Sequence, residues 1–281
     1  MTEPPLISCL MVVRPIPERF RHLRRSLDCY LRQTYARREL VVVIDGRPSE
    51  STADEVKALV QALGRSDVRV VEPADAASLG ALRNVSLDNA RGDLVCIWDD
   101  DDLHHPRRLA VQQAAMEATG AESLCLQHVT QFFEAERQLF CSNFLTSDIG
   151  GLPATLIYRR TAGVRYPESG PRADREEDMA LLEQLAARAA IGKLADQPHL
   201  YVYVCHGANT CGRDHHLAMA RYHAVSPGLI RRREAELRAG LAAFDFGPGA
   251  VSVEGRGGRA FVFQGDDAAA LDDASAAVPL N

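Results

Sequence analysis

Short apolar runs alternate with segments of helical spacing in the N-terminal part of the chain. The runs at 7–13, 40–44, 68–71 and 94–98 are typical of strands covered on both faces. Between them, apolar residues recur at helical spacing over 20–31, 52–63 and 80–90. Thr52 and Glu55 have the spacing of a capping box for the second of these helices. The alternation predicts βαβ units, and so an α/β fold with a twisted, mainly parallel sheet flanked by helices.

The pattern weakens after about residue 120. It predicts strands at 123–133, 138–144, 154–158 and 199–205, an amphipathic helix at 177–190, a charged helix at 231–243 and a hairpin at 251–263. The last dozen or so residues, rich in Ala and Asp, have a composition typical of disorder. We therefore expect a main domain at 1–225 and a small C-terminal extension at 226–281.

Composition places the chain among ordinary globular proteins. With 46% hydrophobic and 25% charged residues and a net charge of −6, it lacks the basic surface that nucleic acids and anionic membranes select. No run approaches the roughly 18–20 apolar residues that span a bilayer. Peripheral membrane association through Arg231, Arg232 and Arg233 stays open, although a solvated helix face is the simpler interpretation.

The cysteines and the N-terminus bear on the compartment. The seven cysteines are scattered and odd in number, without CxxC spacing, which argues against a disulfide framework or a structural zinc site. The apolar run that ends at Val13 follows acidic Glu3 and precedes no small-residue cleavage site, so it is predicted to be a strand rather than a signal peptide. We expect a reducing, cytoplasmic environment.

Four consecutive aspartates, at 99–102, follow the fourth apolar run. Like charges this close repel unless something neutralises them, and a divalent cation such as Mg²⁺ or Mn²⁺ would do so. The alternative is a solvated acidic turn. Asp45 also follows an apolar run, and ligands bind parallel sheets at the carboxyl ends of their strands. His104 and His105 are expected to face solvent or to cap the next helix.

These motifs together resemble the inverting, nucleotide-sugar-dependent glycosyltransferases of family 2, which have the GT-A fold. The matching stretches are ISCLMVV and RSLDCYLRQTYARRELVVVIDG, then SLGALRNVSLDNARGDLVCIWDDDDLHHPRRL, and later REEDMALLEQL. They follow the family's order over roughly residues 6–185. The block from Gly80 to Leu109, in which a DxD motif follows ALRN and an RGD strand, is the most specific.

The resemblance implies a donor site. Asp45 is similar to the aspartate that binds the nucleotide base, and Arg83 to an arginine near the nucleotide. Asp99, Asp100 and Asp101 occupy the DxD positions. Asp100 would lie near the ribose or a phosphate, Asp101 would bind the metal directly, and Asp99 would contribute to both sites. The alternatives without donor binding are that Asp45 is a turn residue and that Arg83 is a surface arginine on a helix.

The resemblance also implies a catalytic carboxylate. Asp178 aligns with the family's general base, with Glu177 as the second choice, although acidic residues also favour a helix N-terminus for its dipole alone. His206 is similar to a late histidine that reaches the diphosphate or the metal in some GT-A enzymes. A structural role for His206 is an equal alternative.

The first strand departs from the family, because Arg14 follows Val13 where a small hydroxyl residue is usual. Arg14 is expected to contact the nucleotide instead. The resemblance implies metal-dependent transfer from a nucleoside-diphosphate sugar, by default a UDP-sugar, to a hydroxyl of a glycan, a lipid-linked glycan or a small molecule. Surface polysaccharide or glycoconjugate synthesis would be the setting. The alternatives are a nucleotidyltransferase and a non-catalytic nucleotide-sugar-binding module.

Overall fold

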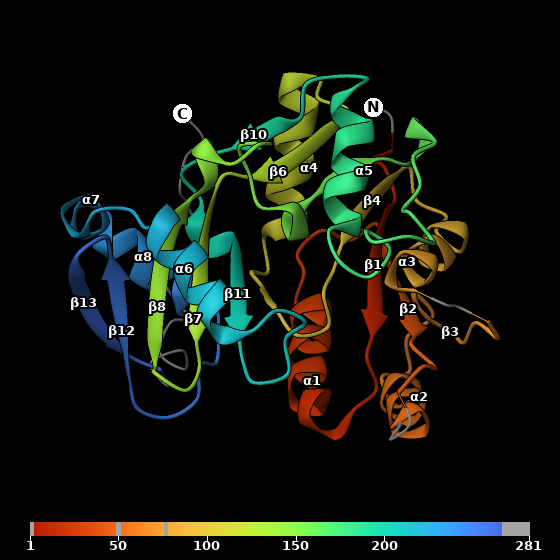
Figure 1. Cartoon of the computed structure of the whole chain (residues 1–281), viewed down its shortest axis with the longest axis horizontal. Coiled ribbons are helices and arrows are strands. Elements are labelled where there is room, and N and C mark those ends of the chain that lie inside the picture. The colour runs from red at the N-terminus through yellow and green to blue at the C-terminus, as the bar shows by residue number, and fades with distance from the viewer. Residues whose placement is uncertain (1–2, 49–51, 76–77, 266–281) are drawn as a thin grey trace.

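The computed structural model describes residues 3–48, 52–75 and 78–265 (Figure 1). It contains two β-sheets with helices packed around them, so the mixed α/β fold class predicted from the sequence is confirmed. The single sheet implied by the pattern is in fact two. The predicted disordered tail lies outside the described residues.

The first sheet has seven strands in the order β10-β6-β9-β4-β1-β2-β3. Its parallel part is made of β1 (Ile7–Val13), β2 (Arg38–Ile44), β3 (Val68–Val71) and β4 (Leu94–Ile97). Beyond them lie β9 (Ile157–Arg159), antiparallel to its neighbours, then β6 (Ser123–Leu126) and β10 (Gly192–Leu194). Every residue of β2 is buried, which explains its uninterrupted apolar run.

Helices cover both faces of this sheet. On one face, α1 (Phe20–Leu31), α2 (Ala53–Ala62) and α4 (Arg108–Thr119) share a core with one set of β1 and β2 side chains. On the other, α3 (Leu79–Asp88) and α5 (Glu177–Ala186) pack against the alternate set. Because successive side chains of a strand point to opposite faces, both sets come from the same apolar runs.

The second sheet has the order β13-β12-β8-β7-β11-β5. Its strands are β5 (Leu103–His104), β7 (His128–Phe133), β8 (Gln138–Asn143), β11 (Tyr201–Cys205), β12 (Ala250–Gly255) and β13 (Gly258–Gln264). The remaining helices are α6 (Arg213–His223), α7 (Pro227–Arg232) and α8 (Glu234–Leu241). Short 3₁₀ turns occupy Pro17–Arg19, Phe144–Thr146, Pro153–Thr155, Arg160–Ala162 and Pro198–Leu200.

The two sheets lie beside each other with α1 between them in the view of Figure 1. The predicted hairpin is confirmed as β12 and β13, and β12 pairs in parallel with β8. Side chains of β12 and β13 share a hydrophobic core with β1. The division at residue 225 stays a prediction, because nothing tests whether either part folds alone.

Three local predictions are wrong. The run at 123–133 is two strands, β6 and β7, which leave Gln127 between them and join different sheets. The charged helix at 231–243 is two helices, α7 and α8, separated at Arg233, whose guanidinium binds Asp196. The capping box does not form: Thr52 accepts no capping hydrogen bond, and its buried hydroxyl has no partner among the described residues.

Two chemical details complete the fold. All seven cysteines are free, and Cys211 is the one that is not fully buried. Within the described ranges, no helix has both the length and the apolar character needed to cross a membrane.

Candidate active site

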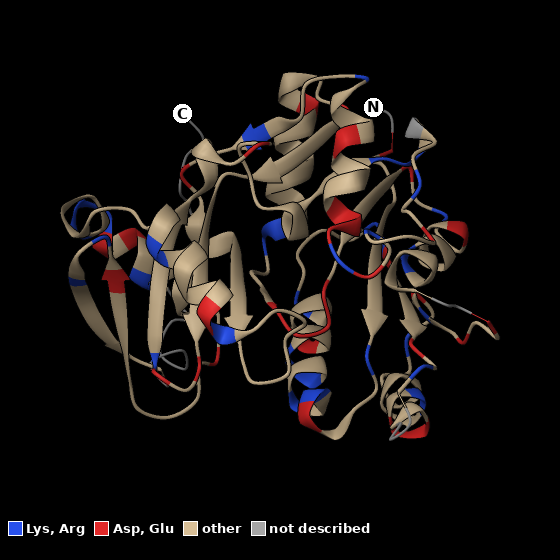
Figure 2. Cartoon of the chain, viewed as in Figure 1, with Lys and Arg blue, Asp and Glu red and all other residues tan. Residues whose placement is uncertain are grey.

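The residues singled out by the sequence gather where β1, β2 and β4 end. Asp45 follows β2, Asp99–Asp102 (the acidic segment) follow β4, and the 3₁₀ turn Pro17–Arg19 lies between β1 and α1. Charged residues of both signs mark these loops around α1 (Figure 2). Parallel strands therefore deliver distant parts of the sequence to one edge of the sheet.

Asp102 ties the two sheets together. Its carboxylate accepts hydrogen bonds from the Tyr201 hydroxyl and from the Val204 backbone N–H, 2.7 Å away, both on β11. Burial, and then repulsion from Asp101, raise the pKa of Asp102. Asp102 therefore has a structural role.

Asp100 and Asp101 share one arginine. Arg19 Nη2 lies 2.6 Å from Asp100 Oδ1 and 2.5 Å from Asp101 Oδ2. Asp100 also accepts the backbone N–H of Arg14 at 3.3 Å. The side chain of Arg14, which was expected to meet the nucleotide, is exposed. Neither the Arg19 contact nor its importance was predicted from the sequence.

His206 approaches the same carboxylate. Its Nε2 lies 3.0 Å from Asp101 Oδ2, and its ring stacks on that of His22. Burial works against ionisation of Asp101, but Arg19 and His206 hold its pKa below the usual range. Burial, with smaller contributions from His206 and nearby arginines, lowers the pKa of His22 to about 3, so His22 is neutral. The structure thus brings the predicted residues Asp101 and His206 together.

Arg83 joins the acidic segment to α5. Its Nε lies 2.9 Å from Glu177 Oε1, and its Nη2 lies 3.4 Å from Asp99 Oδ1. Burial, and then repulsion from Asp101, raise the pKa of Asp99 even though Arg83 opposes the shift. Glu177 is buried, and its carboxylate is engaged in the ion pair with Arg83. Arg83 is therefore a positioning group that holds two of the predicted carboxylates.

Asp178 has different surroundings. Its Oδ1 accepts the N–H of Met179 at 2.7 Å, and the described residues include no ion pair to it. Burial, followed by repulsion from Glu177, raises the pKa of Asp178 to about 6, although Arg83 acts in the opposite direction. A carboxylate with this pKa can take a proton near neutral pH more readily than an ordinary aspartate.

Asp45 is bound by a neighbour that the sequence analysis missed. Arg47 Nε lies 2.8 Å from Asp45 Oδ1, and Arg47 Nη1 lies 2.6 Å from Asp174 Oδ1. Asp174 also accepts the N–H of Leu79 at the start of α3. Arg47 therefore links the predicted base-binding aspartate to the loop that leads into α5. The available signal in the sequence was the position of Arg47, three residues after the end of β2 and two after Asp45.

The histidines after the acidic segment correct one prediction. His104 does not face solvent: it is fully buried and stacks on Trp98, with ring centroids 3.8 Å apart. The β5–β11 pairing covers it. His105 accepts the N–H of Arg107, the residue before α4, but no side chain caps the N-terminus of α4, so the expected cap does not form.

The donor set offers a partial metal site. Among the described residues, no three His, Cys, Asp or Glu side chains are arranged to hold a metal ion. Asp101 Oδ2 and His206 Nε2 nevertheless converge, and a carboxylate with an imidazole suits Mn²⁺. Such ions complete their shells with water and substrate phosphates. Asp99, the other predicted ligand, is instead placed against Arg83.

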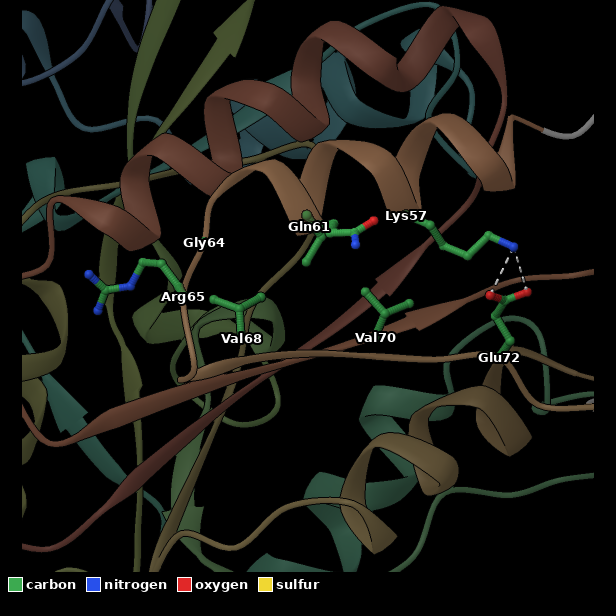
Figure 3. A pocket seen from close by; sticks show the side chains of 8 residues that line it. Lys57, Gln61, Gly64, Arg65, Val68, Val70 and Glu72 are labelled. Carbon is green, nitrogen blue, oxygen red and sulfur yellow. Dashed lines mark hydrogen bonds and ion pairs between the residues drawn. The ribbon is translucent and has the colours of Figure 1, made fainter.

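A surface hollow of about 560 Å³ lies elsewhere, between α2 and β3 (Figure 3). Lys57 and Glu72 form an ion pair at one end of it, and Arg65 lies at the other. It contains none of the residues that the sequence singled out, and it lies on the edge strand β3 rather than at the strand ends. The hollow therefore does not coincide with the site predicted from the sequence.

Two solved structures, among others, have a similar fold. A Staphylococcus aureus TarS fragment in complex with UDP-GlcNAc is 17% identical, with a TM-score of 0.56, over 84% of this chain and 66% of that one. A mannosyltransferase from Pyrobaculum calidifontis, in complex with GDP-mannose and Mn²⁺, is 15% identical, with a TM-score of 0.54, over 87% of this chain and 73% of that one. At this identity the likeness shows the shared GT-A fold alone.

Sequence relatives show the family. An uncharacterised glycosyltransferase of Methanocaldococcus jannaschii is 30% identical over 117 residues, which are 41% of this chain. The match spans only 38% of that relative's length. The sequence model of glycosyl transferase family 2 matches residues 12–167, more than half of the chain, and includes Asp45, Arg83 and the acidic segment. The chain therefore belongs to glycosyl transferase family 2.

Proposed function

We propose that this protein transfers a sugar from a nucleoside-diphosphate sugar to a hydroxyl acceptor with inversion, and that Asp178 is the general base. The observation that carries the proposal is the contrast between Asp178, with its pKa raised to about 6, and Glu177, which is neutralised by Arg83. Arg83 also reaches Asp99, so the proposed base lies near the proposed donor site.

The step balances with these groups. The acceptor oxygen attacks the anomeric carbon as its proton passes to Asp178, and the bond from that carbon to the diphosphate oxygen breaks. The nucleoside diphosphate leaves with the bonding electron pair. A divalent cation held by Asp101 and His206 would act as a Lewis acid on the diphosphate. Arg83, held by Asp99 and Glu177, fixes the α5 N-terminus against the acidic segment.

The donor and metal are also proposals. The similar solved structures contain UDP-GlcNAc in one case and GDP-mannose with Mn²⁺ in the other, so both nucleotide classes have precedent on this fold. We retain a UDP-sugar as the first choice, with Mn²⁺ or Mg²⁺ as the cation. Asp45 would meet the base once Arg47 turns away from it, since Arg47 now bonds both carboxylate oxygens.

The acceptor is proposed only by class. A hydroxyl on a glycan, a lipid-linked glycan or a small molecule would satisfy the step, and surface polysaccharide or glycoconjugate synthesis would use it. Residues 142–153 and 163–172 are the candidate acceptor-side segments, because they lie between the acidic segment and Asp178 in the sequence. A cytoplasmic site of action remains the expectation.

A binding module without turnover is the second candidate. The departure of the first strand from the family pattern, with Arg14 after Val13, favours this alternative, whereas the presence of Asp99–Asp101 and Asp178 favours the enzyme. A nucleotidyltransferase is less favoured, because Arg14-Pro15-Ile16-Pro17 stands where a Gly-rich, lysine-bearing phosphate loop would follow the first strand.

The deciding experiment measures donor binding and turnover in one set of proteins. UDP, GDP, dTDP and CDP, each with and without Mn²⁺, are screened by thermal shift, where a ligand at 100 times its dissociation constant adds about 2.7 kcal/mol of stability. Nucleotide release from the matching sugar donor is then measured for wild type, Asp178→Asn and Glu183→Gln. Glu183 is a matched control because it lies on α5 but pairs with Arg172 at the surface.

We expect Asp178→Asn to keep nucleotide binding and to lose turnover by roughly 10²–10⁴-fold, the range for a general base. Glu183→Gln should match the wild type in both. Equal turnover in Asp178→Asn and wild type would remove Asp178 from the mechanism. Tight nucleotide binding with no turnover by any donor in the wild type would support the binding module.

A further inference from the structure

Arg19 occupies an unusual position for an arginine. It comes from the short 3₁₀ turn after β1, its side chain is only 10% exposed, and its Nη2 bridges Asp100 and Asp101 at 2.6 and 2.5 Å. All four aspartates of the acidic segment favour its charged form. Arg19 thus supplies positive charge at the position where the four aspartates led us to expect a divalent cation.

The bridge involves the oxygen that a metal would need. Asp101 Oδ2 is the atom contacted by both Arg19 Nη2 and His206 Nε2. A metal ligated by Asp101 and His206 would have to approach that oxygen against the positive charge of the guanidinium. Arg19 and a divalent cation therefore compete for one carboxylate.

The bridge is also incomplete. Arg19 Nε is buried and has no hydrogen-bond partner among the described residues. An unmade bond at a buried donor costs free energy, so the present position of the guanidinium is not its best-satisfied one. By contrast, Arg83 uses both its Nε and Nη2 on Glu177 and Asp99. The unsatisfied Nε therefore subtracts from the stability of the Arg19 bridge, a cost that Arg83 does not carry.

We propose that Arg19 is a resident counter-cation that neutralises Asp100 and Asp101 in the metal-free protein and must leave Asp101 before a divalent cation can bind there. Arg19 thereby weakens metal binding by the free protein. The inference rests on the metal site of the proposed function, but it requires neither sugar transfer nor any role for Asp178.

The test uses Mn²⁺ alone, with the full chain and no nucleotide. Free Mn²⁺ is followed by electron paramagnetic resonance, and quenching of Trp98 gives a second signal. Trp98 is the single tryptophan of the chain and directly precedes Asp99. The proteins are wild type, Arg19→Gln, Arg19→Lys and Arg21→Gln. Arg21 is a matched control, because its exposed side chain binds Glu134 instead.

We expect Arg19→Gln to bind Mn²⁺ at least tenfold more tightly than wild type, and Arg21→Gln to bind it as wild type does. Arg19→Lys keeps the positive charge but carries it on a flexible, more strongly hydrated ammonium that should hold the two carboxylates less firmly, so its affinity should fall between the two. Mg²⁺ should compete with Mn²⁺ in every protein without quenching Trp98 by paramagnetism.

Equal Mn²⁺ affinity in wild type and folded Arg19→Gln overturns the proposal. If Arg19→Gln does not fold, an Arg19→Lys protein that binds Mn²⁺ no more tightly than wild type overturns it. If the Mn²⁺ affinity is unchanged, a separate metal-free titration with UDP that shows loss of UDP binding in Arg19→Gln assigns Arg19 to the diphosphate. Because no donor is present in the Mn²⁺ titration, its failure is distinct from a failed transfer assay.

Discussion

The acidic segment and Asp178 are both aspartate sites at the same end of one sheet, yet their surroundings are opposite. Each aspartate of the segment meets a cation or a strong donor: Arg83, Arg19, His206 or Tyr201. Asp178 has a backbone N–H and a repelling glutamate. The comparison shows that neighbouring groups, rather than residue type, decide the role of an aspartate. Aspartates paired with a cation or a strong donor stabilise the structure or bind ligands, whereas an unpaired buried aspartate can exchange a proton.

Removing the Arg83 guanidinium should cause the largest loss of folding stability. Arg83→Met leaves Glu177 and Asp99 near each other without their shared arginine, and breaking such a buried pair costs about 3–5 kcal/mol. Urea denaturation of wild type and variant measures the loss. Arg165→Met is the control, because its pair with Asp88 is exposed and should be worth less than about 1 kcal/mol. Equal costs in both variants would erase the distinction between paired interior and surface charges.

Replacing Asp178 by a neutral residue should increase folding stability rather than lower it. With its folded pKa raised to about 6, the folded protein holds a proton between pH 4 and 6 that the unfolded chain has lost, so stability falls as pH rises through that window. Above pH 6 the folded protein bears the full free-energy cost of burying the ionised Asp178 carboxylate. Asp178→Asn should therefore stabilise the protein by up to about 3 kcal/mol at pH 8 and hardly at all at pH 4, at 1.36 kcal/mol per pKa unit.

Thermal unfolding of both proteins at the two pH values checks this difference, and a destabilised Asp178→Asn at pH 8 would contradict it. The same titration predicts turnover. Because the base acts when deprotonated, turnover by the wild type should decline as pH falls below about 6. A profile flat down to pH 4.5 would show that Asp178 titrates as an ordinary aspartate.

Loss of the hydrogen bond between Tyr201 and Asp102 should lower folding stability less than loss of Arg83. Tyr201→Phe removes one hydrogen bond to Asp102, while the Val204 N–H still donates to that carboxylate. A loss of about 1–2 kcal/mol is expected for one bond to a buried charged group. Tyr203→Phe, on the same strand, is the matched control in equilibrium denaturation. If Tyr203→Phe costs as much, the effect belongs to β11 packing and not to Asp102.

The smallest effect should come from the surface hollow of Figure 3. Lys57 is exposed and pairs there with Asp54 and Glu72. Exposed pairs of this kind contribute little, because water screens them. Lys57→Ala should leave the melting temperature, nucleotide binding and turnover unchanged within error. A marked loss of nucleotide binding would move the donor site to the hollow and away from the acidic segment.

The parallel strands of the first sheet could be predicted well, because β1, β2 and β4 are almost wholly buried and therefore form continuous apolar runs. The runs at 7–13 and 68–71 match β1 and β3 to the residue, and the block around the acidic segment carried the family resemblance. Most strands of the second sheet were predicted, but their assembly into a separate sheet was not, since they come from four separate regions and β5 has only two residues. Pairing between distant segments leaves no local period in the sequence.

The sequence by itself determined the strand–helix order at the N-terminus, the acidic segment at a strand end and the presence of Asp178 at the start of a helix. Only the tertiary structure decided which charges meet: Arg19 with Asp100 and Asp101, Arg83 with Glu177 and Asp99, Arg47 with Asp45. The physical reason is that hydrophobic periodicity is local. Electrostatic partnership instead depends on distances between residues far apart in the chain, which folding alone sets.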